Sequence, residues 1–238
     1  MQNSLQLVLF DLDDTLFDHQ HSRRCGLLTL QKLYAPLAQI PIADLVAEHE
    51  YQLTASYDSV LDGAMSLQAN RLERFRRLFV SFGVTMSPPE VEQAMQRYRR
   101  AYEDHRQAVP GVIPFLMYLK SRLLVGVVTN GLTAIQQEKI RACNLEDCVD
   151  FLLTSEEAGM KKPDRRIFLR ALDIAKVRHE NTVFIGDSWT SDVLGAYRAG
   201  IRSIWLNRLP EPCPDPSLTT ELMAFEPLDR VLEALYAV

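Results

Sequence analysis

The segment LQLVLF, residues 5–10, is followed directly by DLDDT, residues 11–15. A short, nearly unbroken apolar run of this kind predicts a strand buried on both faces, as in a parallel sheet. The three carboxylates Asp11, Asp13 and Asp14 repel one another unless a cation lies among them. Because ligands of parallel sheets bind beyond the carboxyl ends of strands, this turn predicts a ligand site. The alternative is a polar loop that caps the next helix.

Similar apolar runs follow later in the chain, at residues 123–129, 182–185, 202–206 and, more weakly, 151–154. Helical patterns lie between them. One covers residues 133–143, with Thr133 and Gln136 in capping-box spacing. Another covers residues 163–175, with Pro163 at the first helical position. Strands that alternate with helices predict βαβ units and an α/β fold with a doubly wound, Rossmann-like parallel sheet.

Residues 17–108 contain no strand run and show helical patterns throughout. One of these helices is predicted to begin after Ser87, where Glu90 completes a capping box. We therefore expect an all-helical domain at 17–108, inserted into an α/β core formed by residues 1–16 and 109–238.

The composition is that of an ordinary globular protein, with 47% hydrophobic and 24% charged residues among 238. The formal net charge of −5 gives no indication of a nucleic acid polymer or a membrane as a partner. Residues 1–6 lack the features of a signal peptide, and no apolar stretch reaches the roughly 18 residues of a membrane helix. The sequence therefore predicts a soluble, cytoplasmic protein.

A second acidic cluster follows the run at 182–185 and consists of Gly186, Asp187, Ser188 and Asp192. If the two strands are neighbours in the sheet, Asp11, Asp13 and Asp187 converge. Such an all-oxygen set suits a hard cation such as Mg²⁺. Taken alone, Asp187 fits a helix N-cap equally well.

Two further features concern anions. Thr129, Asn130 and Gly131 end an apolar run and lead into a predicted helix, so that a hydroxyl, backbone N–H groups and a helix N-terminus meet. Asn-Gly is also a common turn pair. Lys162 offers a cation near the start of another predicted helix, although a lysine in that place is often only solvated.

In chain order, the motifs are strand-DxDDT, strand-TNG, Lys-Pro and strand-GDSxxxxD. This series resembles the haloacid dehalogenase superfamily over essentially the full chain. The residues that match its four motifs are Asp11 and Asp13, Thr129 and Asn130, Lys162, and Asp187 and Asp192. The helical block at 17–108 takes the place of that family's cap domain, and residues 1–16 and 109–238 take the place of its catalytic core.

The resemblance implies an Mg²⁺-dependent phosphatase that forms an aspartyl phosphate. Asp11 is expected to be the nucleophile and Asp13 the general acid and base. The expected ligands of the metal are Asp11, Asp187 and the Asp13 carbonyl. The residues expected to bind the phosphoryl oxygens are Thr129, the amides of Asn130 and Gly131, and Lys162. Asp192 and Ser188 are expected to support the site.

Two alternative functions are a haloacid dehalogenase and a catalytically silent binding protein. The dehalogenase branch of the superfamily lacks the second aspartate of the first motif, whereas Asp13 is present here. A catalytically silent binding protein on the same fold would usually lack the nucleophile or the lysine, and both positions are filled by Asp11 and Lys162.

The substrate is a small-molecule phosphate ester that the sequence defines less well. Asp14, the Thr15–Phe17 segment and Thr129–Thr133 with glutamines nearby resemble the 5′-nucleotidase branch, so nucleoside 5′-monophosphates are expected. Phosphoglycolate and sugar phosphates remain open. Phe17 fits base stacking or core packing, with packing favoured. Both a monomer and a homodimer are compatible with the sequence, and the proline-rich loop at 209–217 has no predicted function.

Overall fold

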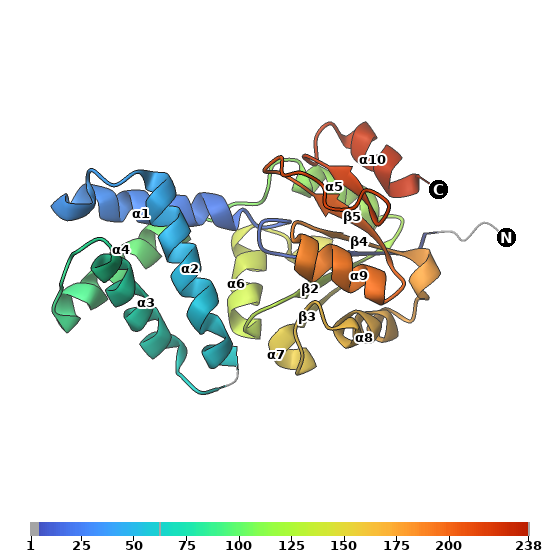
Figure 1. Ribbon diagram of the computed structural model, residues 1–238. Coiled ribbons are helices and arrows are strands. Elements are labelled where there is room, and N and C mark those ends of the chain that lie inside the picture. Colours follow the sequence, from blue (N-terminus) through green and yellow to red (C-terminus); the bar gives the residue numbers. More distant parts are fainter. Residues whose placement is uncertain (1–4, 62, 238) are drawn as a thin grey trace. The chain divides into compact units, whose positions relative to one another are not determined.

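The computed structural model describes residues 5–61 and 63–237 and divides into two compact units, each described here by itself (Figure 1). One unit, the core unit, comprises Met1–Asp18 and Gln107–Val238. The other, the helical unit, comprises His19–Arg106. The division falls two residues inside each boundary expected from the sequence.

Within the described residues of the core unit, six strands form one sheet in which every pairing is parallel. In spatial order they are β3 (Phe151–Thr154), β2 (Leu124–Thr129), β1 (Leu7–Phe10), β4 (Thr182–Gly186), β5 (Arg202–Leu206) and β6 (Thr219–Leu222). The chain moves away from β1 in one direction and later returns to continue on its other side. This confirms the predicted doubly wound, Rossmann-like fold class.

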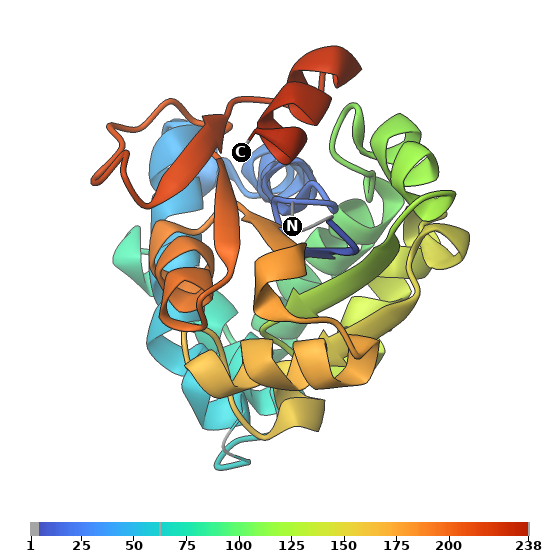
Figure 2. The same cartoon turned by 90° about the vertical axis from the view of Figure 1, so that its right-hand side faces the viewer.

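Helices lie on both faces of this sheet (Figure 2). They are α5 (Val112–Lys120), α6 (Thr133–Ala142), α7 (Ser155–Ala158), α8 (Arg165–Ala175), α9 (Leu194–Arg198) and α10 (Leu228–Tyr236). Shorter segments are η2 (Glu146–Cys148), η3 (His179–Asn181) and the π-helical η4 (Trp189–Val193).

Strand β1 is fully buried because both of its faces are covered. Leu9 packs in the cluster that contains Phe168 of α8. Its neighbour Phe10 points to the other face, where its ring lies 6.0 Å from that of Phe115 of α5. Successive strand residues point to opposite faces, so an unbroken apolar run is the sequence that such a strand requires.

Two local predictions were wrong, and one strand was not predicted. Helix α8 begins at Arg165 rather than at Pro163, and the Asp164 side chain caps it by accepting a hydrogen bond from the Arg166 N–H. Helix α6 has no capping box, because the Gln136 side chain bonds elsewhere. Strand β6 was not predicted, because its sequence, TTEL, is polar and partly exposed.

The helical unit consists of α1 (His19–Leu33), η1 (Ala35–Leu37), α2 (Ile42–Leu61), α3 (Leu67–Ser81) and α4 (Pro88–Asp104). Their apolar faces enclose a core that includes Leu27 and Phe79. The capping box predicted for α4 is present, with the Ser87 N–H donating to Glu90 Oε2 at 2.7 Å. Within the residues described, the chain has no helix of the length and apolarity that a bilayer crossing requires.

Candidate active site

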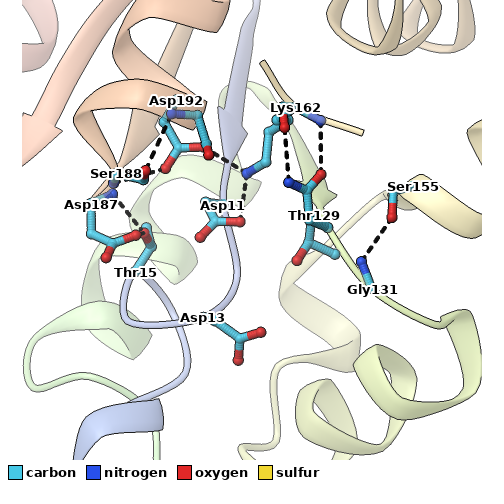
Figure 3. A network of polar contacts seen from close by, with 12 residues as sticks. Asp11, Asp13, Thr15, Thr129, Gly131, Ser155, Lys162, Asp187, Ser188 and Asp192 are labelled. Carbon is cyan, nitrogen blue, oxygen red and sulfur yellow. Dashed lines mark hydrogen bonds and ion pairs between the residues drawn. The ribbon is translucent and has the colours of Figure 1, made fainter. Parts of the chain in front are cut away.

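Three of the predicted site residues lie at the carboxyl ends of three neighbouring strands. Asp11 follows β1, Thr129 ends β2, and Asp187 follows β4. Strands β2 and β4 both pair with β1 in register, and Phe10 lies opposite Val127 on one side and Ile185 on the other. The strand ends are therefore level, and the side chains meet at one edge of the sheet (Figure 3).

A cavity of about 220 Å³ opens at this edge. It is lined by Asp11, Asp13, Asp14, Thr129, Asn130, Lys162, Asp187, Ser188, Ser191 and Asp192. All the predicted site residues are thus brought together except Gly131. Residues more than 170 positions apart in the chain share the cavity because β1 and β4 are neighbours.

Lys162 lies at the centre of the buried charges. Its Nζ is 2.6 Å from Asp11 Oδ1 and 2.7 Å from Asp192 Oδ1, and its side chain is almost fully enclosed. Burial lowers the pKa of Lys162, but attraction to Asp11 and Asp192 outweighs this and raises the pKa above its ordinary value. Lys162 is therefore a fixed positive charge beside Asp11.

The Lys162 backbone is fixed by Asn130. The Asn130 side chain accepts from the Lys162 N–H at 2.8 Å and donates to the Lys162 carbonyl at 3.0 Å. This reciprocal pair connects the end of β2 with the segment that carries Lys162. The Asn130 side chain therefore positions Lys162.

Asp187 is held through its backbone. Its N–H donates to Thr15 Oγ1 at 3.1 Å, and its carbonyl accepts from Trp205 Nε1 at 2.7 Å. Burial, followed by repulsion from Asp11 and Asp192, raises the pKa of Asp187 well above its ordinary value. Burial also raises the pKa of Asp11 to about 7, although Lys162 opposes the shift.

These carboxylates fit a divalent cation. Asp11, Asp187 and Asp192 each present an oxygen, and the three atoms lie within 4.8 Å of one another. Two ligands on opposite sides of Mg²⁺ are roughly 4 Å apart, so the spacing is close to that of a metal site. Oxygen-only donors and raised carboxyl pKa values are the features that a hard cation satisfies. Asp192, which was expected only to support the site, also presents an oxygen to this cluster.

Gly131 differs from its expected role. Its N–H donates to Ser155 Oγ at 2.9 Å, and Gly131 does not line the cavity. Its φ of 152° and the 3.2 Å between a built Cβ and Gln136 Cδ explain the glycine instead, because a side chain here would press on Gln136. The amide of Gly131 is thus not presented to a phosphoryl group in this structure.

Two residues of the site, Lys139 and Gln136, were not predicted from the sequence. Lys139 Nζ lies 2.6 Å from Asp13 Oδ1 and 2.7 Å from Asp13 Oδ2. Gln136 Nε2 is 3.2 Å from Asp13 Oδ2 and 2.7 Å from Thr129 Oγ1. Gln136 and Lys139 are three residues apart on α6 and so share one helix face. That spacing, directly after the TNG motif, was the available signal.

Phe17 is fully buried in the core unit. The preference for core packing over base stacking is therefore confirmed. Its ring centroid lies 5.4 Å from Lys139 Nζ, so Phe17 also packs beside the Asp13 partner.

Comparisons with known proteins identify the family. The profile of the haloacid dehalogenase-like hydrolases matches residues 5–200, and the chain belongs to this family. The resemblance drawn from the motifs is confirmed. The chain is 28% identical to the HAD-hydrolase YfnB of Bacillus subtilis, over 94% of both chains. It is 30% identical to the pyrimidine 5′-nucleotidase PynA of Streptococcus pneumoniae, over 85% of this chain and 84% of PynA. Other relatives are named as phosphatases for glyceraldehyde 3-phosphate and for phosphoserine.

Solved structures show the same fold. The magnesium-bound crystal structure of Bacillus subtilis YfnB superposes with a TM-score of 0.73 at 26% identity, covering 96% of this chain and 99% of YfnB. A 2-haloacid dehalogenase from Pseudomonas syringae superposes with a TM-score of 0.63 at 28% identity, covering 96% and 98%. Proteins with this fold thus include named phosphatases and named dehalogenases, so the two activities can be distinguished only by the residues of the site.

Proposed function

We propose that this protein is an Mg²⁺-dependent phosphomonoester hydrolase that works through an aspartyl phosphate on Asp11. One observation supports this most directly. Five carboxylates line the cavity together with a single lysine, Lys162. Such a site repels a phosphate dianion unless a cation is bound, and the three clustered oxygens of Asp11, Asp187 and Asp192 offer a place for one.

The residues that would hold Mg²⁺ are Asp11, Asp187 and Asp192, with the Asp13 carbonyl as the further ligand expected from the sequence. When bound, the ion supplies positive charge that lets an anionic carboxylate approach an anionic phosphate. It also favours the ionised form of Asp11, whose pKa is otherwise about 7.

In the first step, a carboxylate oxygen of Asp11 attacks phosphorus and the bond from phosphorus to the leaving oxygen breaks. Lys162 and the Thr129 hydroxyl stabilise the charge on the phosphoryl oxygens, because both line the cavity beside Asp11. Asp13 donates a proton to the leaving oxygen, and the alcohol departs.

In the second step, water attacks the phosphorus of the aspartyl phosphate and the bond to the Asp11 oxygen breaks. Asp13, now a carboxylate, takes a proton from that water. Inorganic phosphate leaves, and Asp11 is restored. Asp192 and the Asn130 side chain keep Lys162 in place during both steps.

Asp13 favours phosphate chemistry over haloacid chemistry. A halide is a good leaving group and needs no proton, whereas an alkoxide does. Asp13 lines the cavity, so a carboxyl group is available there to protonate the leaving oxygen. A 2-haloacid such as 2-chloropropionate should therefore not be turned over.

Among phosphate esters, we propose nucleoside 5′-monophosphates as the substrates. The support is the nucleotidase-like sequence at Asp14–Phe17 and Thr129–Thr133 and the 30% identity to PynA. The relatives named for other phosphate esters make triose and sugar phosphates and phosphoglycolate the necessary comparison set.

The test is a kcat/KM panel on purified protein with pyrimidine and purine nucleotides, sugar phosphates, phosphoglycolate and 2-chloropropionate, with and without Mg²⁺. We expect Mg²⁺-dependent phosphate release, fastest from a nucleotide. Rapid acid quench followed by mass spectrometry should place a phosphoryl group on the peptide that contains Asp11. Hydrolysis without phosphoryl transfer to that peptide would contradict the mechanism, and a higher kcat/KM for another ester would contradict the substrate.

A further inference from the structure

The proposed reaction assigns no role to the side chains of α6, yet α6 holds the Asp13 carboxylate. Both oxygens of Asp13 are within 2.7 Å of Lys139 Nζ. Lys139 is itself 7% exposed, which is unusual for a lysine. Lys139 is 126 residues from Asp13 in the sequence, and its ammonium group contacts both oxygens of that one carboxylate. We therefore ask what this contact does for Asp13.

Gln136 makes the same connection from the same helix face. It is 1% exposed, and its side-chain amide reaches Asp13 Oδ2 and Thr129 Oγ1. Gly131 leaves the room that this side chain occupies. Asp13, in the turn after β1, and the Thr129 hydroxyl at the end of β2 are therefore joined through α6.

The position of Asp13 is distinct from that of the Asp11–Lys162 group. In Figure 3 the Asp13 carboxylate points away from Asp11, whereas Lys162 and Asp192 lie on the other side of Asp11. Without a partner, an aspartate that follows a strand end can take several rotamers. Two charge-assisted contacts to one ammonium group select one of them.

We infer that Lys139 is a positioning residue for the general acid and base, and that with Gln136 it fixes Asp13 where the leaving oxygen must be protonated. This rests on the proposed phosphatase function. A misplaced Asp13 slows proton transfer in both steps but does not weaken phosphoryl binding, and in the first step it affects only leaving groups that need a proton.

The experiment compares Lys139→Met and Lys139→Arg with the wild type on two kinds of ester. For alkyl phosphates, whose leaving group needs protonation, we expect Lys139→Met to lower kcat/KM about 10- to 100-fold. For p-nitrophenyl phosphate, which has a good leaving group, we expect kcat/KM to change by less than about threefold. The comparison uses kcat/KM because it reports the first step, whereas kcat includes the second step, in which Asp13 is the base for every ester. Lys139→Arg should recover most of the loss, and the inhibition constant of inorganic phosphate should not change.

Two controls isolate the contact. In an Asp13→Asn background, Lys139→Met should cause no further loss, because residues that act as a unit are not additive. Lys120→Met removes another lysine of the core unit that pairs with an aspartate, Asp150, away from the cavity, and should leave kcat unchanged.

Equal losses of kcat/KM for both kinds of ester, or a weaker inhibition by phosphate, would overturn the inference and make Lys139 a phosphoryl ligand. Unchanged rates for both would overturn it as well. If the wild type hydrolyses no phosphate ester, the proposed function fails. The contact is then judged by thermal unfolding, in which Lys139→Met should destabilise the wild type but not Asp13→Asn. Equal destabilisation of both backgrounds would refute it.

Discussion

In the core unit, the buried carboxylates of Asp11 and Asp192 share the ammonium group of Lys162. In the helical unit, the imidazole of the buried His49 lies beside the rings of Phe75 and Tyr98, and neither of its nitrogens has a hydrogen-bond partner among the described residues. One region buries charges that hold one another in place. The other buries a polar group without satisfying it.

The difference extends to the direction of the pKa shifts. Burial raises the pKa of Asp11 to about 7, whereas burial, with help from Arg74 and Arg23, lowers the pKa of His49 well below its ordinary value. In both groups, burial shifts the protonation equilibrium toward the neutral form. The buried acids of the core unit can bind a cation and take part in catalysis, whereas the neutral imidazole of His49 packs among aromatic rings.

The largest effect is expected from Asp11→Asn. An amide cannot attack phosphorus, so turnover should fall at least about 10⁴-fold, as measured by phosphate release under saturating nucleotide and Mg²⁺. Asp147→Asn, at an exposed position, is the matched control and should retain full activity. Retention of more than a few percent of activity by Asp11→Asn would remove Asp11 from the nucleophile role.

Gly186→Ala is expected to have the next largest effect. A Cβ at this position would lie 2.4 Å from Asp192 Oδ2, and Asp192 holds both Lys162 and the Ser188 N–H. Displacing Asp192 should move Lys162 away from Asp11, and we expect kcat/KM to fall about 100-fold as a result.

The control is Gly159→Ala, at a φ of +70° with no atom near the added Cβ. It should cost about 1–2 kcal/mol of unfolding free energy and leave kcat/KM unchanged. Similar activity of the two variants would show that the Asp192 contact is dispensable.

The metal-free protein should lose stability as the pH rises. Because the folded pKa of Asp11, about 7, lies above the unfolded value of 3.8, the folded state binds more protons across this window. That contribution is complete below pH 4 and is lost as the pH passes 7. We expect the Tm in EDTA to fall by about 5 °C or more between pH 5 and pH 8, and Mg²⁺ to restore it.

Asp187→Asn separates this effect from the titration of the rest of the chain, since its amide neither titrates nor repels Asp11. The variant should show a flatter pH profile in EDTA and a smaller gain from Mg²⁺. An identical response of the wild type and the variant would contradict a metal site built on Asp187.

The same contrast explains what the sequence could predict. Asp11 and Asp187 are recognisable because each directly follows an apolar strand, and Asp13 is two residues beyond Asp11. Neighbouring strand ends place the three together. Lys139 was missed because the pattern of α6 does not show which of its side chains reaches Asp13, 126 residues away. Strand β6 was missed because an edge strand needs no apolar face.

The helical unit was predictable only as a pattern of apolar stripes. Glu90 fixes the start of α4 by a local bond to Ser87, which is why that prediction was correct. Nothing in the stripe pattern indicated that His49 is buried, because its environment depends on how four helices pack. Sequence periodicity therefore predicts helices better than it predicts what fills the space between them.

The smallest expected effect tests the helical side of the comparison. His49→Phe replaces two unbonded nitrogens with apolar atoms and keeps a ring beside Phe75 and Tyr98, so it should raise stability by about 1 kcal/mol, or 2–4 °C in Tm, at pH 7.5. His49→Leu is closer in side-chain volume to the wild type and controls for overpacking by the larger phenylalanine.

The effect should depend on pH. Because the folded pKa of His49 lies below the unfolded 6.5, the wild type loses stability as the pH falls below that value, and both variants should gain more stability at pH 5.5. Destabilisation by both variants at pH 7.5 would mean that the imidazole is satisfied in the folded protein, and the contrast between the two units would then disappear.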